Sequence, residues 1–135
     1  AASDVYKRQP LDYPALIGLL ADCHFCLTDS GGIQEEASAL KKPVLITRQS
    51  TERQELVDAG GALLVGTDPH AIVEQASALL RDGDLYRVMQ ATPCPFGDGH
   101  SAMRIVDVLT GHPEGVTNWH AAHPWTARSI GMRTH

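Results

Sequence analysis

The stretch Leu27–Glu36, LTDSGGIQEE, places a strand, a glycine turn and the start of a helix one after another. The strand is indicated by His24–Thr28, which is rich in aromatic and apolar residues and is stopped by the turn at Asp29–Gly32. Strong helix formers fill Ile33–Leu40 after the turn. The stretch therefore predicts a strand–turn–helix unit, which is the building block of an α/β fold.

Strands and helices continue to alternate on both sides of this unit. Apolar runs over 44–47 and 62–65 are typical of buried parallel strands. Helices are expected over residues 14–22, 33–40, 52–59, 69–81, 85–90 and 101–109, with a turn at 82–84. This spacing favours parallel βαβ units. Because only three strands are visible, we expect a Rossmann-like parallel sheet that lacks its first strands.

Composition excludes several classes of function. The chain has 135 residues, about one domain, with 11 basic and 16 acidic residues and a formal net charge of −5. That balance excludes a nucleic-acid-binding protein that works through bulk positive charge. No apolar run approaches the roughly 20 residues that span a bilayer, so no membrane partner is expected. Three cysteines without a secretion signal fit a reducing cytoplasm.

The two ends differ in character from the middle of the chain. Residues 1–9 have no initiator Met and no apolar region. We predict that they are a non-native leader and that the gene is truncated upstream of them, with a genuine disordered N-terminus as the alternative. Residues 111–135 contain Gly, Pro, Thr and Trp without any period and are predicted to be a poorly structured tail. Residues 10–110 would then form the patterned domain.

The spacing of the histidines and cysteines in the sequence predicts neither a metal site nor a redox site. The tail holds four of the seven histidines, His112, His120, His123 and His135. Their spacing does not place them on one helix face, and no metal site is expected. Cys23 and Cys26 straddle a helix end and a strand start, where a redox Cys-x-x-Cys pair is not expected, and Cys94 is far along the chain. We predict that all three cysteines are structural.

The glycine turn has the properties of an anion cradle. The first N–H groups of a helix lack partners and the helix dipole favours negative charge there. Gly31 and Gly32 let a phosphate approach the backbone, and the Ser30 hydroxyl can cap the helix or donate to a phosphate oxygen. Glu36 lies one turn deeper than Gly32 on the same face, where it could accept both hydroxyls of a ribose. An ordinary capped turn is the alternative, since neither Gly-x-Gly-x-x-Gly nor a P-loop is present.

Motifs in register give the chain a resemblance to the UDP-N-acetylglucosamine 2-epimerases. They are TDSGGIQEE (28–36), KPVL (42–45), Arg48, TERQE (51–55), AG (59–60), LVGTD (64–68) and PFGDG (95–99). The family has Thr-Glu-Arg-Pro-Glu and Asn-Pro-Tyr-Gly-Asp-Gly at the fourth and last of these places. The resemblance covers residues 10–110. It implies an α/β fold with two Rossmann-like domains facing across a cleft, as in GT-B glycosyltransferases, and this chain is similar to part of the second domain.

The resemblance also implies which residues hold UDP. Ser30 and Gly32 would contact the diphosphate, Gly31 would shape the turn, and Glu36 would hold the ribose hydroxyls. Arg53 would lie against the diphosphate, where a guanidinium suits phosphate oxygens. Spacing alone favours a different role for Arg53, which is a surface ion pair with its neighbours Glu52 or Glu55.

Three further positions are less specific. Arg48 is similar to Arg53 as a candidate for the diphosphate. The family often has an aromatic residue against the uracil, and the equivalent position here is Leu16. Leucine covers a ring face but loses an aromatic stacking contribution of about 1 kcal/mol. Tyr13 lies one turn earlier, and helix packing is an equal explanation for it.

The family reaction interconverts UDP-N-acetylglucosamine and UDP-N-acetylmannosamine by loss and re-addition of UDP, through a 2-acetamidoglucal. Its acids and bases come mainly from the first domain and from a His-Arg-Arg-Glu segment, and none of them is in this chain. The resemblance therefore implies a UDP-sugar substrate, no cofactor, and no catalytic residue here. Asp29, Glu35 and Glu52 are not substitutes. The parent would be a cytoplasmic homodimer that serves surface-polysaccharide precursors, whereas this chain alone would be inactive and bind UDP weakly.

Three other functions share the glycine turn. A hydrolysing epimerase releases UDP and free N-acetylmannosamine, and residues of the first domain separate it from the non-hydrolysing type. A GT-B glycosyltransferase shares the turn and the ribose-binding glutamate, but the Thr-Glu-Arg and Gly-Asp-Gly segments argue against it. A nucleotide-binding or regulatory module without catalysis is the third.

Overall fold

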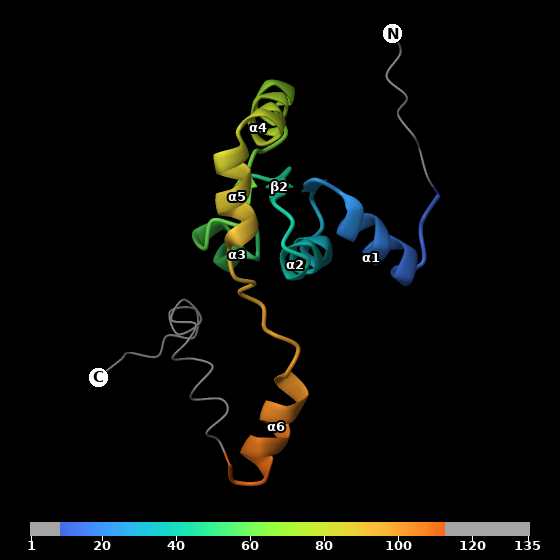
Figure 1. Ribbon diagram of the computed structural model, residues 1–135, viewed down its shortest axis with the longest axis vertical. Coiled ribbons are helices and arrows are strands. Elements are labelled where there is room, and N and C mark those ends of the chain that lie inside the picture. The colour runs from blue at the N-terminus through green and yellow to red at the C-terminus, as the bar shows by residue number, and fades with distance from the viewer. Residues whose placement is uncertain (1–8, 113–135) are drawn as a thin grey trace, which may run out of the picture.

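The computed structural model describes residues 9–112 (Figure 1). Apart from Gln9, Gly111 and His112, the predicted leader (1–9) and tail (111–135) lie outside the described residues. The chain forms helices α1 (Tyr13–Asp22), α2 (Gly31–Ala39), α3 (Gln54–Asp58), α4 (Pro69–Arg81), α5 (Gly83–Ala91) and α6 (Ser101–Leu109), and strands β1 (Cys26–Thr28), β2 (Val44–Ile46) and β3 (Ala62–Leu64).

The strands form one parallel sheet in the order β1-β2-β3, as the spacing predicts. Thr28, Ile46 and Leu64 stand side by side at its carboxyl end. Strand β2 lies in the centre and is wholly buried, which is why its sequence is a continuous apolar run. The parallel α/β fold expected from the sequence is confirmed.

Helices cover both faces of the sheet, because side chains alternate between the faces along each strand. Val44 and Ile46 of β2 pack with Ala37 of α2 and Leu56 of α3 on one face. Leu45, between them in sequence, packs on the other face with residues of α4 and α5. In Figure 1, α2 and α3 lie on one side of β2 and α4 on the other. The short sheet is therefore the middle of three layers.

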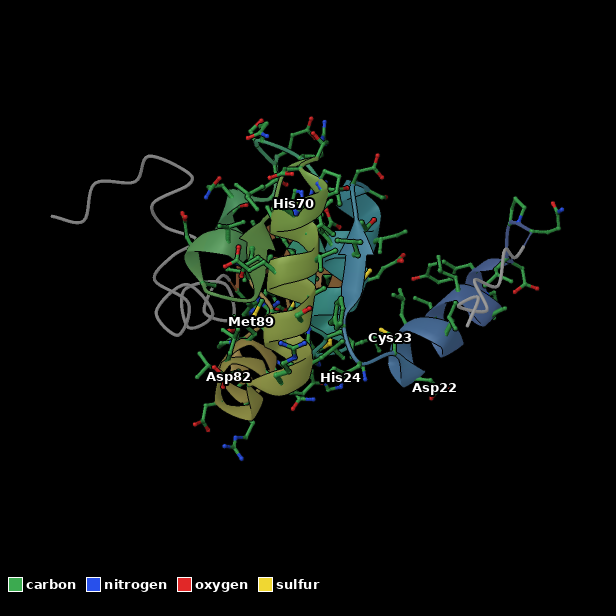
Figure 2. The ribbon with its side chains drawn as sticks, turned by 90° about the horizontal axis from the view of Figure 1, so that it is seen from above. Asp22, Cys23, His24, His70, Asp82 and Met89 are labelled. Atoms are coloured by element: carbon green, nitrogen blue, oxygen red, sulfur yellow. The ribbon has the colours of Figure 1, made fainter. Side chains whose placement is uncertain are left out.

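Asp82 joins α4 to α5, and this connection is shorter than the turn expected at 82–84 (Figure 2). It is the C-cap of α4 and the N-cap of α5. Helix α5 therefore begins at Gly83, whereas the sequence predicted a start at Leu85. Its carboxylate accepts hydrogen bonds from the N–H groups of Asp84 (2.9 Å) and Leu85 (3.1 Å). Asp82 alone therefore forms the connection for which the sequence predicted a three-residue turn.

Asp82→Ala should lower the free energy of unfolding by about 1 kcal/mol, since an N-cap is lost. Urea unfolding followed by circular dichroism measures the change. Asp22→Ala is the matched control, because Asp22 ends α1, where the dipole disfavours an acid and its removal should not destabilise. Equal destabilisation by both substitutions would contradict the cap.

Helix α6 and strand β1 leave apolar side chains uncovered in the described part of the chain. Helix α6 has no buried residue and stands apart from the layers in Figure 1. Its exposed apolar side chains are Met103, Ile105, Val106, Val108 and Leu109. Strand β1 is an edge strand, and Leu27 on it is 47% exposed. Among residues 9–112, no helix is long and apolar enough to cross a membrane.

Candidate functional site

The glycine turn lies at the carboxyl end of β1 and opens α2. Ser30 is the N-cap, accepting a hydrogen bond from the N–H of Ile33 over 3.5 Å, while its own N–H donates to Thr28 Oγ1 at 3.1 Å. The helix begins at Gly31, two residues before the predicted start at Ile33. The glycines are therefore the first residues of the helix and not a loop in front of it.

This helix start leaves backbone N–H donors without a partner in the described residues. Within residues 9–112, the N–H groups of Gly31 and Gly32 donate no hydrogen bond. A Cβ built on Gly32 would meet no atom within 4 Å, so the space beside it is open. Two unpaired donors at the positive end of a helix, with open space beside Gly32, can bind an anion.

Arg53 lies beside this cradle. A Cβ on Gly31 would be 4.0 Å from both Cζ and Nη2 of Arg53. Arg53 Nε donates to Oε1 of Glu35, and Nη1 donates to the carbonyl of Glu52 at 3.5 Å. The ion pair predicted from spacing, with Glu52 or Glu55, is thus wrong, because the partner comes from α2. Nη2 makes no hydrogen bond within residues 9–112 and, like Cζ, lies beside Gly31.

Two residues that sequence reasoning missed hold the loop of Arg53 in place. Thr51 Oγ1 accepts the N–H of Arg53 at 3.1 Å and donates to Oε1 of Gln34 at 2.8 Å. Gln34 is fully buried in the first turn of α2, and its Nε2 has no partner in the described part of the chain. Thr51 therefore ties the loop before α3 to the start of α2. The position of Thr51, two residues before Arg53, was the feature of the sequence that could have identified this role.

Glu36 lies on α2 and Tyr13 on α1, and these two helices contact each other (Figure 1). Glu36 is half-buried, whereas Tyr13 is 63% exposed. The negative charge of Glu36, then burial, then a side-chain hydrogen bond to Glu36 raise the pKa of Tyr13. Such exposure does not support the packing explanation for Tyr13. Leu16, one turn further along α1, is half-buried.

No polar contact joins Arg48 to these residues within residues 9–112. Arg48 follows β2, its side chain is exposed, and it makes no hydrogen bond or ion pair with residues 9–112. The structure thus brings Ser30, Gly31, Gly32 and Arg53 together, and Glu36 lies one turn deeper on α2.

Cys23 and Cys26 have structural surroundings. Cys23, at the end of α1 in Figure 2, donates its thiol to the carbonyl of Leu20 at 3.2 Å. Cys26 packs against the core, as predicted, and burial raises its pKa to about 11. A thiol that stays protonated is a poor nucleophile. Residues 9–112 contain no cluster of three metal-ligating side chains, and His120, His123 and His135 lie outside that range.

The Gly-Asp-Gly segment lies just before α6. Phe96 packs against the core. Asp98 binds the guanidinium of Arg104 through both oxygens, with Nη1 at 2.7 Å, and accepts the N–H of His100 at 3.1 Å. The hydrogen bond from Arg104 holds the pKa of Asp98 well below its usual value. Asp98 is therefore engaged in fixing this turn.

Comparison with known proteins gives a consistent result. The family model for UDP-N-acetylglucosamine 2-epimerase matches residues 2–110. A probable UDP-N-acetylglucosamine 2-epimerase of Ralstonia solanacearum is 44% identical over 110 residues, which are 82% of this chain and 29% of that protein. The Escherichia coli K12 enzyme is 47% identical over 106 residues, 78% of this chain and 28% of that protein.

Solved structures agree. The UDP-GlcNAc 2-epimerase of Neisseria meningitidis, bound to UDP-GlcNAc, superposes with a TM-score of 0.73 at 39% identity, over 77% of this chain and 28% of that one. S. aureus MnaA, solved with UDP, gives a TM-score of 0.71 at 42% identity, over 75% and 28%. The chain thus spans less than a third of the length of the relatives it matches.

Proposed function

The chain belongs to the UDP-N-acetylglucosamine 2-epimerase family, and we propose that it is the part of such an enzyme that binds UDP. It would form part of the C-terminal domain of a GT-B-type two-domain isomerase. The observation that carries the proposal is the pair of unpaired N–H groups at Gly31 and Gly32, with the Arg53 guanidinium beside them.

In this proposal each part of UDP meets a group of matching chemistry. The diphosphate lies on Ser30, Gly31 and Gly32, with the Nη2 of Arg53 as a further donor. Glu36 accepts the ribose hydroxyls one turn deeper along α2. Leu16 covers the base from α1, and Arg48 is a further candidate for the diphosphate. Two solved relatives hold UDP or UDP-GlcNAc, which supports the ligand class.

The proposed contribution of this chain to the reaction is to hold the leaving group. When the sugar C1–O bond breaks, negative charge builds up on the diphosphate. Fixed N–H donors and a guanidinium at that position stabilise the charge as it develops. Glu35 is already bound to Arg53, so it is not available as a proton-transfer group. The acids and bases of the parent come from outside this chain, which alone should not epimerise UDP-N-acetylglucosamine.

Membership of the family argues against the glycosyltransferase alternative. Hydrolysing and non-hydrolysing epimerases both release UDP, so the same site serves either type. We propose that the parent works in the cytoplasm on precursors of surface polysaccharide, as a homodimer. The uncovered apolar side of α6 and the free edge of β1 suit a chain that packs against further parts of a larger enzyme.

Glu36→Gln should lower the preference for UDP over 2′,3′-dideoxy-UDP by about tenfold, because a carboxylate binds hydroxyls more strongly than an amide does. Backbone NMR titration of the chain measures both affinities and shows that the variant is folded. Glu74→Gln on the exposed side of α4 is the control and should change neither affinity. An unchanged preference in Glu36→Gln would overturn the ribose contact.

A further inference from the structure

Arg53 is held to α2 at two neighbouring residues, once through its side chain and once through its backbone. Its guanidinium binds the carboxylate of Glu35. Its backbone N–H donates to Thr51 Oγ1 at 3.1 Å, and the Thr51 hydroxyl in turn donates to Oε1 of Gln34 at 2.8 Å. The contact with Glu35 uses a guanidinium N–H, for which a phosphate would compete. The contact through Thr51 leaves the guanidinium untouched.

The backbone of Arg53 is not fixed by its place at the start of α3. Arg53 is the N-cap residue, but its side chain makes no capping hydrogen bond. Its ψ of 48° also differs from the extended ψ of the capping residues Ser30 (124°) and Asp68 (120°). Helix α3 has five residues, too few to be a stable helix by itself. The hydrogen bond to Thr51 therefore contributes to fixing where the Arg53 side chain starts.

The amide of Gln34 destabilises the fold at the position that it occupies. The side chain is fully buried, and its Nε2 donates to no acceptor in the part of the chain that the structure describes. A buried donor without a partner loses its hydrogen bonds to water and gains none in return. An apolar side chain would avoid that loss. What the amide provides is the contact with Thr51, and Thr51 contacts Arg53.

We propose that Gln34 and Thr51 are positioning residues for Arg53, which hold its backbone so that the guanidinium lies beside Gly31 before UDP binds. This inference rests on the proposed UDP site. A Cβ on Gly31 would be 4.0 Å from both Cζ and Nη2 of Arg53, so the guanidinium lies at the cradle. A side chain that is ordered in advance loses less freedom on binding. The pair thus lowers the stability of the fold and raises the affinity for the diphosphate.

The double variant Thr51→Val/Gln34→Leu separates these two effects. Replacing both partners of a buried hydrogen bond with apolar groups of similar shape costs little stability, so the variant should stay folded. UDP affinity should nevertheless fall about fivefold, the cost of ordering one long side chain, while uridine affinity should not change. Backbone NMR titration measures both affinities, and urea unfolding measures the stability.

Three further variants show whether the effect passes through Arg53. Thr51→Ser keeps the hydroxyl and should keep the wild-type UDP affinity. In an Arg53→Met background, the double substitution should weaken UDP binding no further. Thr92→Val is the matched control and should leave UDP affinity unchanged. The Thr92 hydroxyl donates to the carbonyl of Val88 at 3.3 Å, and Thr92 lies at the amino end of β3, where a Cβ on Gly61 would be 3.3 Å from its Cγ2.

Each contrary outcome has a distinct meaning. Wild-type UDP affinity in a stable double variant overturns the positioning role and leaves the proposed function standing. Equal losses for UDP and uridine, or a fivefold loss that persists in the Arg53→Met background, also overturn it, because the effect then does not pass through the guanidinium. A double variant less stable than Thr51→Val alone contradicts the premise that the Gln34 amide destabilises the fold. If Arg53→Met binds UDP like wild type, the proposed place of Arg53 in the UDP site fails, and this inference fails with it.

Discussion

Replacing Arg53 with methionine should weaken UDP binding by about a hundredfold, which corresponds to about 2.7 kcal/mol. Charge-assisted hydrogen bonds to a phosphate contribute about 1.5–3 kcal/mol, and methionine keeps much of the apolar stem of arginine. The loss also has a second cause. Without the guanidinium, the Glu35 carboxylate stands uncompensated beside the cradle and repels the diphosphate. NMR titration at UDP concentrations that half-saturate the wild-type chain should show almost no binding.

Variants of Glu35 separate the two causes. Glu35→Gln alone should raise UDP affinity, because it removes a competing partner and frees Arg53 for the phosphates. The double variant Arg53→Met/Glu35→Gln should recover part of the hundredfold loss. Adding salt should weaken binding to the wild-type chain more than to Arg53→Met, since screening acts on the charge that the variant lacks. If Arg53→Met bound UDP like wild type, Arg53 would be only the ion-pair partner of Glu35.

Thr51→Val should lower the free energy of unfolding by about 2 kcal/mol. The substitution keeps the shape of the side chain and removes both hydrogen bonds of its hydroxyl. Gln34, fully buried, would then have neither end of its amide paired within the described residues. Urea unfolding gives the change in stability. UDP affinity should fall as well, because the loop that presents Arg53 is no longer tied to α2.

The double variant Thr51→Val/Gln34→Leu is the decisive control. Replacing both partners of a buried hydrogen bond with apolar groups of similar shape costs little, so the double variant should be more stable than Thr51→Val alone. Thr67→Val, at an exposed position, should leave stability nearly unchanged. Additive losses from Thr51→Val and Gln34→Leu would show that the two side chains do not act as a pair.

The sheet and its helices could be predicted from local patterns, because each element has its own signal. The run Val44–Ile46 is wholly apolar and proves to be the buried central strand. Helix α4 begins at Pro69, as expected, with Asp68 as its N-cap. The starts of α2 and α5 were misplaced by two residues because both helices open on glycine, the poorest helix former after proline. In each case the preceding Ser30 or Asp82 caps the helix and outweighs that propensity.

Only the part of the site that consecutive residues form could be predicted from the sequence. Ser30, Gly31 and Gly32 are consecutive, so their joint geometry follows from the helix start. The contacts of Arg53 with Glu35 and of Thr51 with Gln34 join segments that lie 18 and 17 positions apart in the chain. The packing of helices on the sheet decides those contacts, and no local pattern encodes it. Spacing therefore favoured Glu52 or Glu55 as the partner of Arg53, and the structure supplies Glu35.

The most direct measurement is a backbone NMR titration of the chain with UDP, with uridine as the comparison ligand. UDP should shift the amide signals of Gly31 and Gly32 more than any others in residues 9–112, together with the side-chain Nε of Arg53. Uridine, which lacks the diphosphate, should leave those signals nearly in place. Absence of UDP-dependent shifts at the two glycines, or largest shifts at a distant site such as α4, would contradict the proposal that the start of α2 holds the diphosphate.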